Sequence, residues 1–89
     1  MIYKVKSGFI VRKIGSQIMA VPVGQQTSEL HGMIALTESA ELLWRSLKDG
    51  ATVETLVHVL AKEYDVDPEI ASTDVEHFLQ GLKEQGALE

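Results

Sequence analysis

The chain has 89 residues, which is enough for one small domain with a single modest core. It contains no cysteine, which excludes disulfides, iron–sulfur clusters, thiolate zinc sites and cysteine nucleophiles. The net charge of −5 is unevenly distributed: residues 1–45 hold five Lys or Arg against three Asp or Glu, and residues 46–89 hold three against ten. This acidic second half disfavours nucleic acid as a partner, because binding nucleic acid depends on neutralising phosphates.

The sequence shows no membrane-spanning or targeting segment. No apolar run approaches the roughly 18 residues that a transmembrane helix needs. The first residues, MIYKVK, lack the apolar core and cleavage site of a signal peptide. No repeat, low-complexity stretch or linker divides the chain. We therefore expect a cytoplasmic protein with one domain over residues 1–89.

Two β-like runs open the chain. Residues 9–14 (FIVRKI) and 17–23 (QIMAVPV) are rich in β-formers and are separated by Gly15-Ser16, a pattern typical of a β-hairpin. Pro22 cannot donate a ladder hydrogen bond, so we place it at a strand end or on an edge.

A polar segment and a third short strand follow. Residues 24–30 (GQQTSEL) are polar and aperiodic and predict a loop. The apolar run that begins at His31 predicts a strand over residues 33–36 (MIAL). Sheet edges are usually protected by charge, proline or a bulge, but residues 32–36 contain neither a charged residue nor a proline. If this strand lies at an edge, that edge is open to another chain, and Gly32 would allow close approach of its backbone.

Three helices are predicted after the strands. Thr37 is a fitting N-cap for a helix that begins at Glu38 and ends at Asp49-Gly50. Thr52 caps a second helix whose apolar stripe runs from residue 53 to residue 64. Asp67-Pro68-Glu69 is the strongest helix start in the chain, and this third helix is expected to reach about Gln85 before Gly86.

The order of elements predicts an α+β domain in which helices cover one face of a small antiparallel sheet. Three helices with short connections plus a hairpin are the elements of a winged helix-turn-helix. The fold class expected is therefore a winged helix-turn-helix with three short N-terminal antiparallel strands followed by three helices.

The third helix has an unusual flank. Val75, Leu79 and Leu82 form its central apolar stripe. The flank beside that stripe is made by Asp74, Phe78, Gly81 and Gln85. A glycine inside a helix costs about 1 kcal/mol relative to alanine. Gly81 therefore indicates either close approach of a ligand or relief of crowding between helices. Phe78 is either a core aromatic or a groove residue or both, and Asp74 is either part of a site or a solvated carboxylate.

No residue pattern indicates catalysis. His31, His58 and His77 are not spaced three or four apart, and no Cys or H-E-x-x-H pattern supports a metal site. The serines lack a nucleophile-elbow setting, and no glycine-rich phosphate loop is present. We therefore expect no catalytic residue, no metal, no cofactor and no enzymatic activity.

Four segments resemble the PqqD family, which is named after the small protein of pyrroloquinoline quinone biosynthesis. They are FIVRKIGSQIMAVPVG, GMIALTESAELLW, GATVETLVHVLAKEYDVD and DVEHFLQGLKEQGAL, and together they extend from about Phe9 to Leu88. The sharpest pieces are residues 36–40 (LTESA) and the helical pattern of Asp74-Val75, Phe78-Leu79 and Leu82.

This resemblance implies a winged-helix peptide recognition element for ribosomally made, post-translationally modified peptides. In such proteins the leader of a precursor peptide docks as an added strand beside the third strand, in a groove walled by the third helix. The domain then presents the precursor to a modifying enzyme, often a radical SAM maturase. The residues expected to bind peptide are Gly32, Met33, Ile34, Ala35, Leu36, Asp74, Phe78, Gly81 and Gln85.

The sequence also departs from the quinone-pathway members. Those members are expected to carry Tyr-Pro-Glu-Gly where this chain has residues 21–24 (VPVG), and Asn where it has Thr37. A stand-alone relative that serves another peptide pathway therefore fits better. Its partners would be a precursor peptide and a modifying enzyme, and the free strand edge also makes a homodimer an expectation to test.

A winged-helix DNA-binding regulator is the alternative. In residues 68–89 the basic residues are Lys83 and His77, against five acidic ones, which is a poor recognition helix. Basic residues lie instead on the N-terminal segment and the hairpin, including Arg12 and Lys13. That hairpin is a candidate contact for an acidic surface of the modifying enzyme.

Overall fold

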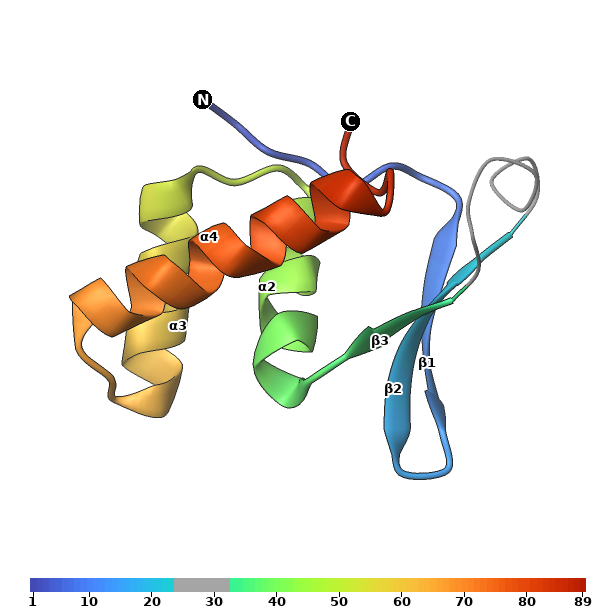
Figure 1. The fold of residues 1–89 in the computed structure, drawn as a ribbon, viewed down its shortest axis with the longest axis horizontal. Coiled ribbons are helices and arrows are strands. Elements are labelled where there is room, and N and C mark those ends of the chain that lie inside the picture. Colours follow the sequence, from blue (N-terminus) through green and yellow to red (C-terminus); the bar gives the residue numbers. More distant parts are fainter. Residues whose placement is uncertain (24–32) are drawn as a thin grey trace.

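The computed structural model describes residues 1–23 and 33–89 and has a three-stranded sheet beside three helices (Figure 1). The elements in chain order are β1 (Phe9–Ile14), β2 (Gln17–Pro22), β3 (Ile34–Leu36), α2 (Glu38–Lys48), α3 (Val53–Tyr64) and α4 (Pro68–Glu84). The expected fold class, three antiparallel strands followed by three helices, is confirmed. The predicted loop over residues 24–30, together with His31 and Gly32, lies outside the described residues.

The sheet has the order β1-β2-β3, and both pairings are antiparallel. The β1–β2 hairpin turns at Gly15, whose φ of +63° suits glycine. Pro22 is the last residue of β2, as a residue without an N–H requires. In the second pairing, Ala20 lies opposite Ile34. The third strand begins at Ile34 rather than at Met33, and β3 is an edge strand of the described sheet.

The helices begin at the caps that the sequence indicated. The Thr37 side chain accepts a hydrogen bond from the Ala40 N–H, and the Thr52 side chain accepts one from the Thr55 N–H, both at 3.1 Å. The Asp67 carboxylate accepts a hydrogen bond from the Glu69 N–H at 2.8 Å. Each bond satisfies a backbone donor that a helix start leaves unpaired, so short local motifs fix where the helices begin.

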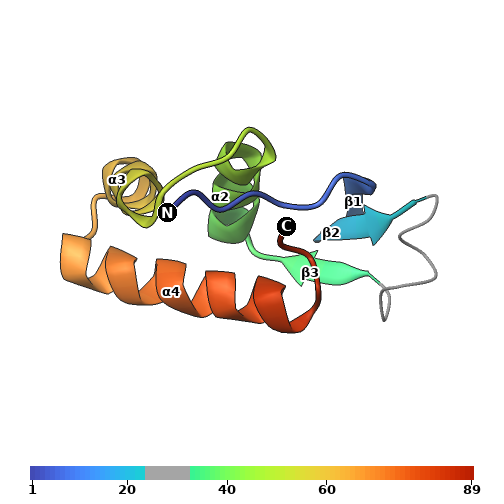
Figure 2. The same ribbon diagram turned by 90° about the horizontal axis from the view of Figure 1, so that it is seen from above.

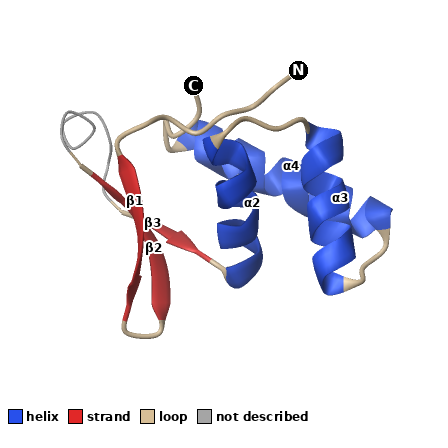
Figure 3. Cartoon of the chain, turned by 180° about the vertical axis from the view of Figure 1, so that it is seen from behind, coloured by secondary structure: helices blue, strands red, loops and turns tan. Residues whose placement is uncertain are grey.

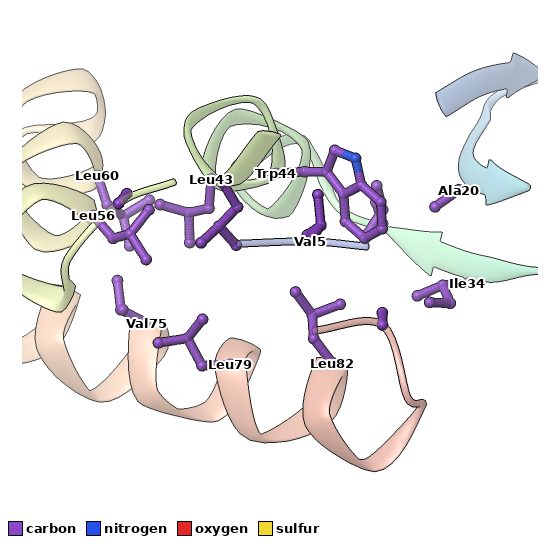
Figure 4. Packing of buried hydrophobic residues seen from close by; sticks show 14 of the residues in the cluster. Val5, Ala20, Ile34, Leu43, Trp44, Leu56, Leu60, Val75, Leu79 and Leu82 are labelled. Atoms are coloured by element: carbon purple, nitrogen blue, oxygen red, sulfur yellow. The ribbon is translucent and has the colours of Figure 1, made fainter. Parts of the chain in front are cut away.

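The core lies among the three helices and extends to the sheet at one side (Figure 4). Trp44 of α2 is 1% exposed, and its indole ring packs edge-on against Phe9 of β1. From α4, the predicted stripe of Val75, Leu79 and Leu82 points into the same cluster. The helices lie on one face of the sheet, which stands at one side of the molecule (Figure 3).

The N-terminal segment ties the two ends of the chain together, which the sequence did not indicate. Tyr3 and Ala51 exchange backbone hydrogen bonds of 2.8 and 2.9 Å. The Lys6 N–H donates to the Ala87 carbonyl at 2.8 Å, and the Glu89 N–H donates to the Lys4 carbonyl at 2.9 Å. The segment therefore fixes the loop before α3 and the turn after α4. None of the described helices is long and apolar enough to cross a membrane.

Candidate binding groove between β3 and α4

A groove of about 390 Å³ lies between the edge strand β3 and one face of α4. Viewed from above, the C-terminal part of α4 runs beside β3 (Figure 2). The first turn of α2 also contributes to the lining of this groove. The lining residues are Ile34, Ala35, Leu36, Thr37, Ser39, Ala40, Leu43, Leu60, Asp74, His77, Phe78, Gly81, Leu82 and Gln85.

On the strand side, β3 contributes its backbone and its alternating side chains. Ile34 and Leu36 are 8% and 7% exposed and pack into the core, whereas Ala35 is exposed on the other face of the sheet. Within the described part of the chain, β3 pairs with β2 alone. The condition set in the sequence, that this strand lies at a sheet edge, therefore holds among the described residues, and an edge strand presents a row of N–H and C=O groups without ladder partners.

On the helix side, the groove residues recur every three or four positions along α4, which places them on one face of the helix. Phe78 is half-buried, and its ring packs against the core cluster while also lining the groove. Of the readings left open for Phe78, the structure therefore supports the combined one. Asp74 and Gln85 are exposed and lie towards the two ends of the groove, eleven residues apart on α4.

Gly81 opens the middle of this helix face. A Cβ atom added at Gly81 would meet no atom within 4 Å. Of the two readings left open for Gly81, relief of crowding between helices is not supported, because no other element among the described residues approaches this position. The missing side chain instead leaves free volume in the groove, at a helix position where glycine costs about 1 kcal/mol relative to alanine.

The structure brings seven of the nine predicted site residues to the groove, namely Ile34, Ala35, Leu36, Asp74, Phe78, Gly81 and Gln85. Gly32 lies outside the described residues. Met33 does not line the groove: it precedes β3 and is 55% exposed.

Sequence reasoning missed His77 and the residues that α2 contributes to the groove. A signal for His77 was present, because this residue comes three positions after Asp74 and four before Gly81 on the same helix face. The contribution of Ser39 and Ala40 depends on how α2 approaches α4, and no local pattern indicates that approach.

The groove is mainly apolar, with few polar groups. The Thr37 hydroxyl is already used in the cap of α2, and it also lies 3.1 Å from the Ser39 hydroxyl. Among the described residues, Asp74 is the one carboxylate that lines the groove. Across residues 1–23 and 33–89, no three His, Asp or Glu side chains gather to hold a metal ion. The arrangement is suited to binding an extended chain through an open strand edge and an apolar wall.

The fold and this groove define a small α+β binding domain in which an edge strand and a helix face each other. Residues 22–88 match the model of the family described as coenzyme PQQ synthesis protein D (PqqD), and the chain belongs to this family. The resemblance noted in the sequence is thereby confirmed. Among curated proteins, no match is found.

Solved structures with the same fold include three peptide-pathway proteins. TbiB1 in complex with the TbiA(beta) leader peptide is 22% identical, with a TM-score of 0.75 over 97% of this chain and 94% of that chain. Lasso peptide synthetase B1 complexed with its leader peptide is 21% identical, with a TM-score of 0.74 over 98% of this chain and 96% of that one. The PqqD truncation of Methylobacterium extorquens PqqCD, a stand-alone recognition element, is 20% identical, with a TM-score of 0.75 over 99% and 88%.

Proposed function

We propose that this protein is a non-catalytic adaptor that binds the leader segment of a ribosomally synthesised precursor peptide and presents the precursor to a modifying enzyme. The observation that carries the proposal is the position of the open β3 edge directly beside an apolar groove on α4. Family membership and the leader-bound structures of similar fold support the same function.

The proposed mode of binding is strand addition. The leader lies along β3 as a fourth strand, and the backbone groups of residues 34–36 form hydrogen bonds with it. Since side chains alternate along a strand, every second leader side chain then points towards α4. Those side chains enter the apolar groove beside Phe78 and over Gly81.

The energy required is within reach of this small site. Micromolar affinity corresponds to about −8 kcal/mol. Each net hydrogen bond contributes about 1 kcal/mol, and each fully buried apolar side chain contributes about 1.5–3 kcal/mol. Backbone pairing at the edge together with two or three buried leader side chains therefore accounts for recognition. In this proposal Asp74 and Gln85 fix the register, because each offers a polar group at one end of an otherwise apolar wall.

The chemistry of modification belongs to the partner in this proposal. A radical SAM maturase is the partner class that the sequence resemblance implies, and it stays an expectation. That the protein meets the precursor in the cytoplasm, where ribosomes release it, also stays a prediction. For the alternative of DNA binding we find no supporting observation, since α4 carries four acidic residues and only Lys83 and His77 as basic ones.

The proposal is tested by titrating isotope-labelled protein with the leader segment of the nearest encoded precursor and following backbone amide shifts by NMR. We expect the largest shifts at residues 34–36 and 74–85. A scrambled leader of equal composition should produce no saturable shift. If saturating leader moves no amide in either segment, the proposed function is wrong.

A matched pair of variants tests the groove itself. Gly81→Leu fills the open volume over α4, whereas Gln80→Leu adds the same side chain at an exposed position that does not line the groove. We expect Gly81→Leu to weaken leader binding at least tenfold and Gln80→Leu to change it less than twofold. Equal effects of the two variants would contradict binding in this groove.

A further inference from the structure

The sheet has apolar side chains on both faces, although the described helices cover only one. The inner face contributes Ala20, Ile34 and Leu36 to the core, and Phe9, Val11 and Ile18 pack against them. An antiparallel sheet with one solvated face normally alternates apolar and polar residues, whereas near-continuous apolar strands are typical of sheets buried on both sides.

The opposite side, which we call the outer face, is defined by the register. The pairs that share it are Ile10–Val21, Arg12–Met19, Ile14–Gln17 and Met19–Ala35. Ile10 and Ile14 are 46% and 52% exposed, and Met33, two residues before Ala35, is 55% exposed. Arg12 is the only charged residue among these, so the outer face is an apolar surface with one cation on its β1 edge.

A leader added to the β3 edge would enlarge this surface. The leader side chains that do not point towards α4 project onto the outer face, beside Ala35. The outer face and the bound leader therefore form one continuous four-stranded surface. A partner on this side contacts the hairpin and the bound leader simultaneously without displacing α4.

We propose that the outer face is the surface on which the modifying enzyme docks, with contacts to both the β1–β2 hairpin and the outward-facing side chains of the bound leader. The inference rests on the proposed function. The enzyme surface that fits is apolar, with a carboxylate opposite Arg12, because a buried guanidinium needs a paired anion.

A second copy of the chain is a poorer occupant. Arg12 lies between Ile10 and Ile14 on the edge strand β1 and opposite Met19 of β2. The paired positions that make up the outer face include no carboxylate, so a second copy packed face to face offers Arg12 no anion. A guanidinium buried without an anion opposes association.

The size of the outer face indicates that docking depends on the leader. Even if β3 were as long as the six-residue strands β1 and β2, about 3.3 Å per residue and about 4.8 Å between strands would give a surface of only about 20 by 14 Å. This is small against the roughly 800 Å² per partner of a standard interface. A bound leader adds a strand to it, so enzyme affinity should rise when the leader is present. By linkage, the enzyme should then tighten leader binding by the same factor.

The test measures binding of the modifying enzyme encoded beside the precursor gene, with and without the leader peptide. The variants are Arg12→Glu and the double variant Ile10→Thr with Ile14→Thr, which keeps β-branched residues in the strand. We expect each to weaken enzyme binding at least tenfold and to leave leader affinity within twofold of the original protein. In the unsubstituted protein the leader should strengthen enzyme binding at least fivefold.

The control variants carry the same kinds of substitution at exposed positions outside the outer face. Ile70→Thr removes an isoleucine that is 58% exposed on α4, and Lys48→Glu reverses an exposed charge at the end of α2. Both should bind the enzyme normally. The proposal is overturned if the outer-face variants bind the enzyme as well as the controls do, or if the enzyme does not bind the unsubstituted protein.

Two further outcomes can be told apart from enzyme docking with a bound leader. If the unsubstituted protein is a dimer on a sizing column and the Ile10→Thr, Ile14→Thr variant is a monomer, the outer face joins two copies and the assignment to the enzyme is wrong. If the leader does not bind but the enzyme does, and the outer-face variants abolish that contact, the proposed leader function fails while the docking surface stands.

Discussion

Phe9 meets Trp44 edge-on, with ring centroids 5.3 Å apart and ring planes inclined at 79°. The contact joins β1, the strand farthest from the groove, to α2, whose first turn lines part of the groove. It therefore helps to hold the sheet at a fixed position relative to the helices. Because Trp44 is the only tryptophan and is almost fully buried, its fluorescence reports whether this arrangement is intact.

Replacing Phe9 by leucine should lower the free energy of unfolding by about 1 kcal/mol, the typical value of an aromatic pair beyond its buried area. Urea unfolding followed by Trp44 fluorescence measures the change. An unaltered unfolding midpoint would mean that the edge-on contact contributes nothing.

Replacing Gly81 by alanine should stabilise the free protein by about 0.5–1 kcal/mol, because alanine loses less conformational entropy in a helix. The new methyl group has no atom within 4 Å to clash with. Thermal unfolding measures the effect. A lower melting temperature would show that the backbone at this position is strained against alanine.

Replacing Phe78 by alanine should weaken leader binding and also lower stability, because the ring is shared between the core and the groove. We expect a loss of about 1–2 kcal/mol of stability for this half-buried side chain. Leader affinity should fall about tenfold when it is measured well below the melting temperature. A variant with full affinity would exclude Phe78 from the recognition surface.

The two threonine caps form a matched pair. Thr37→Ala and Thr52→Ala should each cost about 1 kcal/mol, because each removes one hydrogen bond to a free helical N–H. Only Thr37 lines the groove, so only Thr37→Ala should also alter leader binding. The comparison is made by chemical unfolding and by leader titration on both variants. If Thr37→Ala and Thr52→Ala bind the leader with the same affinity, the geometry of the groove does not depend on the α2 cap.

The N-terminal segment should contribute to stability through Val5, which is 5% exposed within the core cluster. Val5→Ala should lower the free energy of unfolding by about 2 kcal/mol, from lost burial and the space left behind. Exposed Val23→Ala serves as the control, and we expect it to change stability by less than 0.5 kcal/mol. Similar losses in both variants would contradict a structural role for the segment.

Local motifs explain why so much of the fold was predictable from the sequence. Thr37, Thr52 and Asp67 each act within three residues of their own position, so the helix starts follow from short segments alone. The groove face of α4 was predictable for a similar reason, because helical periodicity alone places Asp74, Phe78, Gly81 and Gln85 together.

Contacts between distant segments were not predictable in the same way. The pairing of Tyr3 with Ala51 is made through backbone groups, which leave no mark on residue type. Met33 was expected to bind peptide because the apolar run does not indicate where β3 begins, and the strand starts one residue later, at Ile34. The purpose of Gly81 also required the structure, since only its surroundings separate crowding from open space.

The uncharged β3 edge has a consequence for how the protein behaves in isolation. An edge that accepts one extended peptide accepts others, including the same edge of a neighbouring molecule. The net charge of −5 opposes such encounters by mutual repulsion, and added salt screens that repulsion. Colloidal stability should therefore be best in dilute, low-salt solution. Co-expression with a leader should raise the soluble yield, because the backbone groups of β3 are then already paired with the leader.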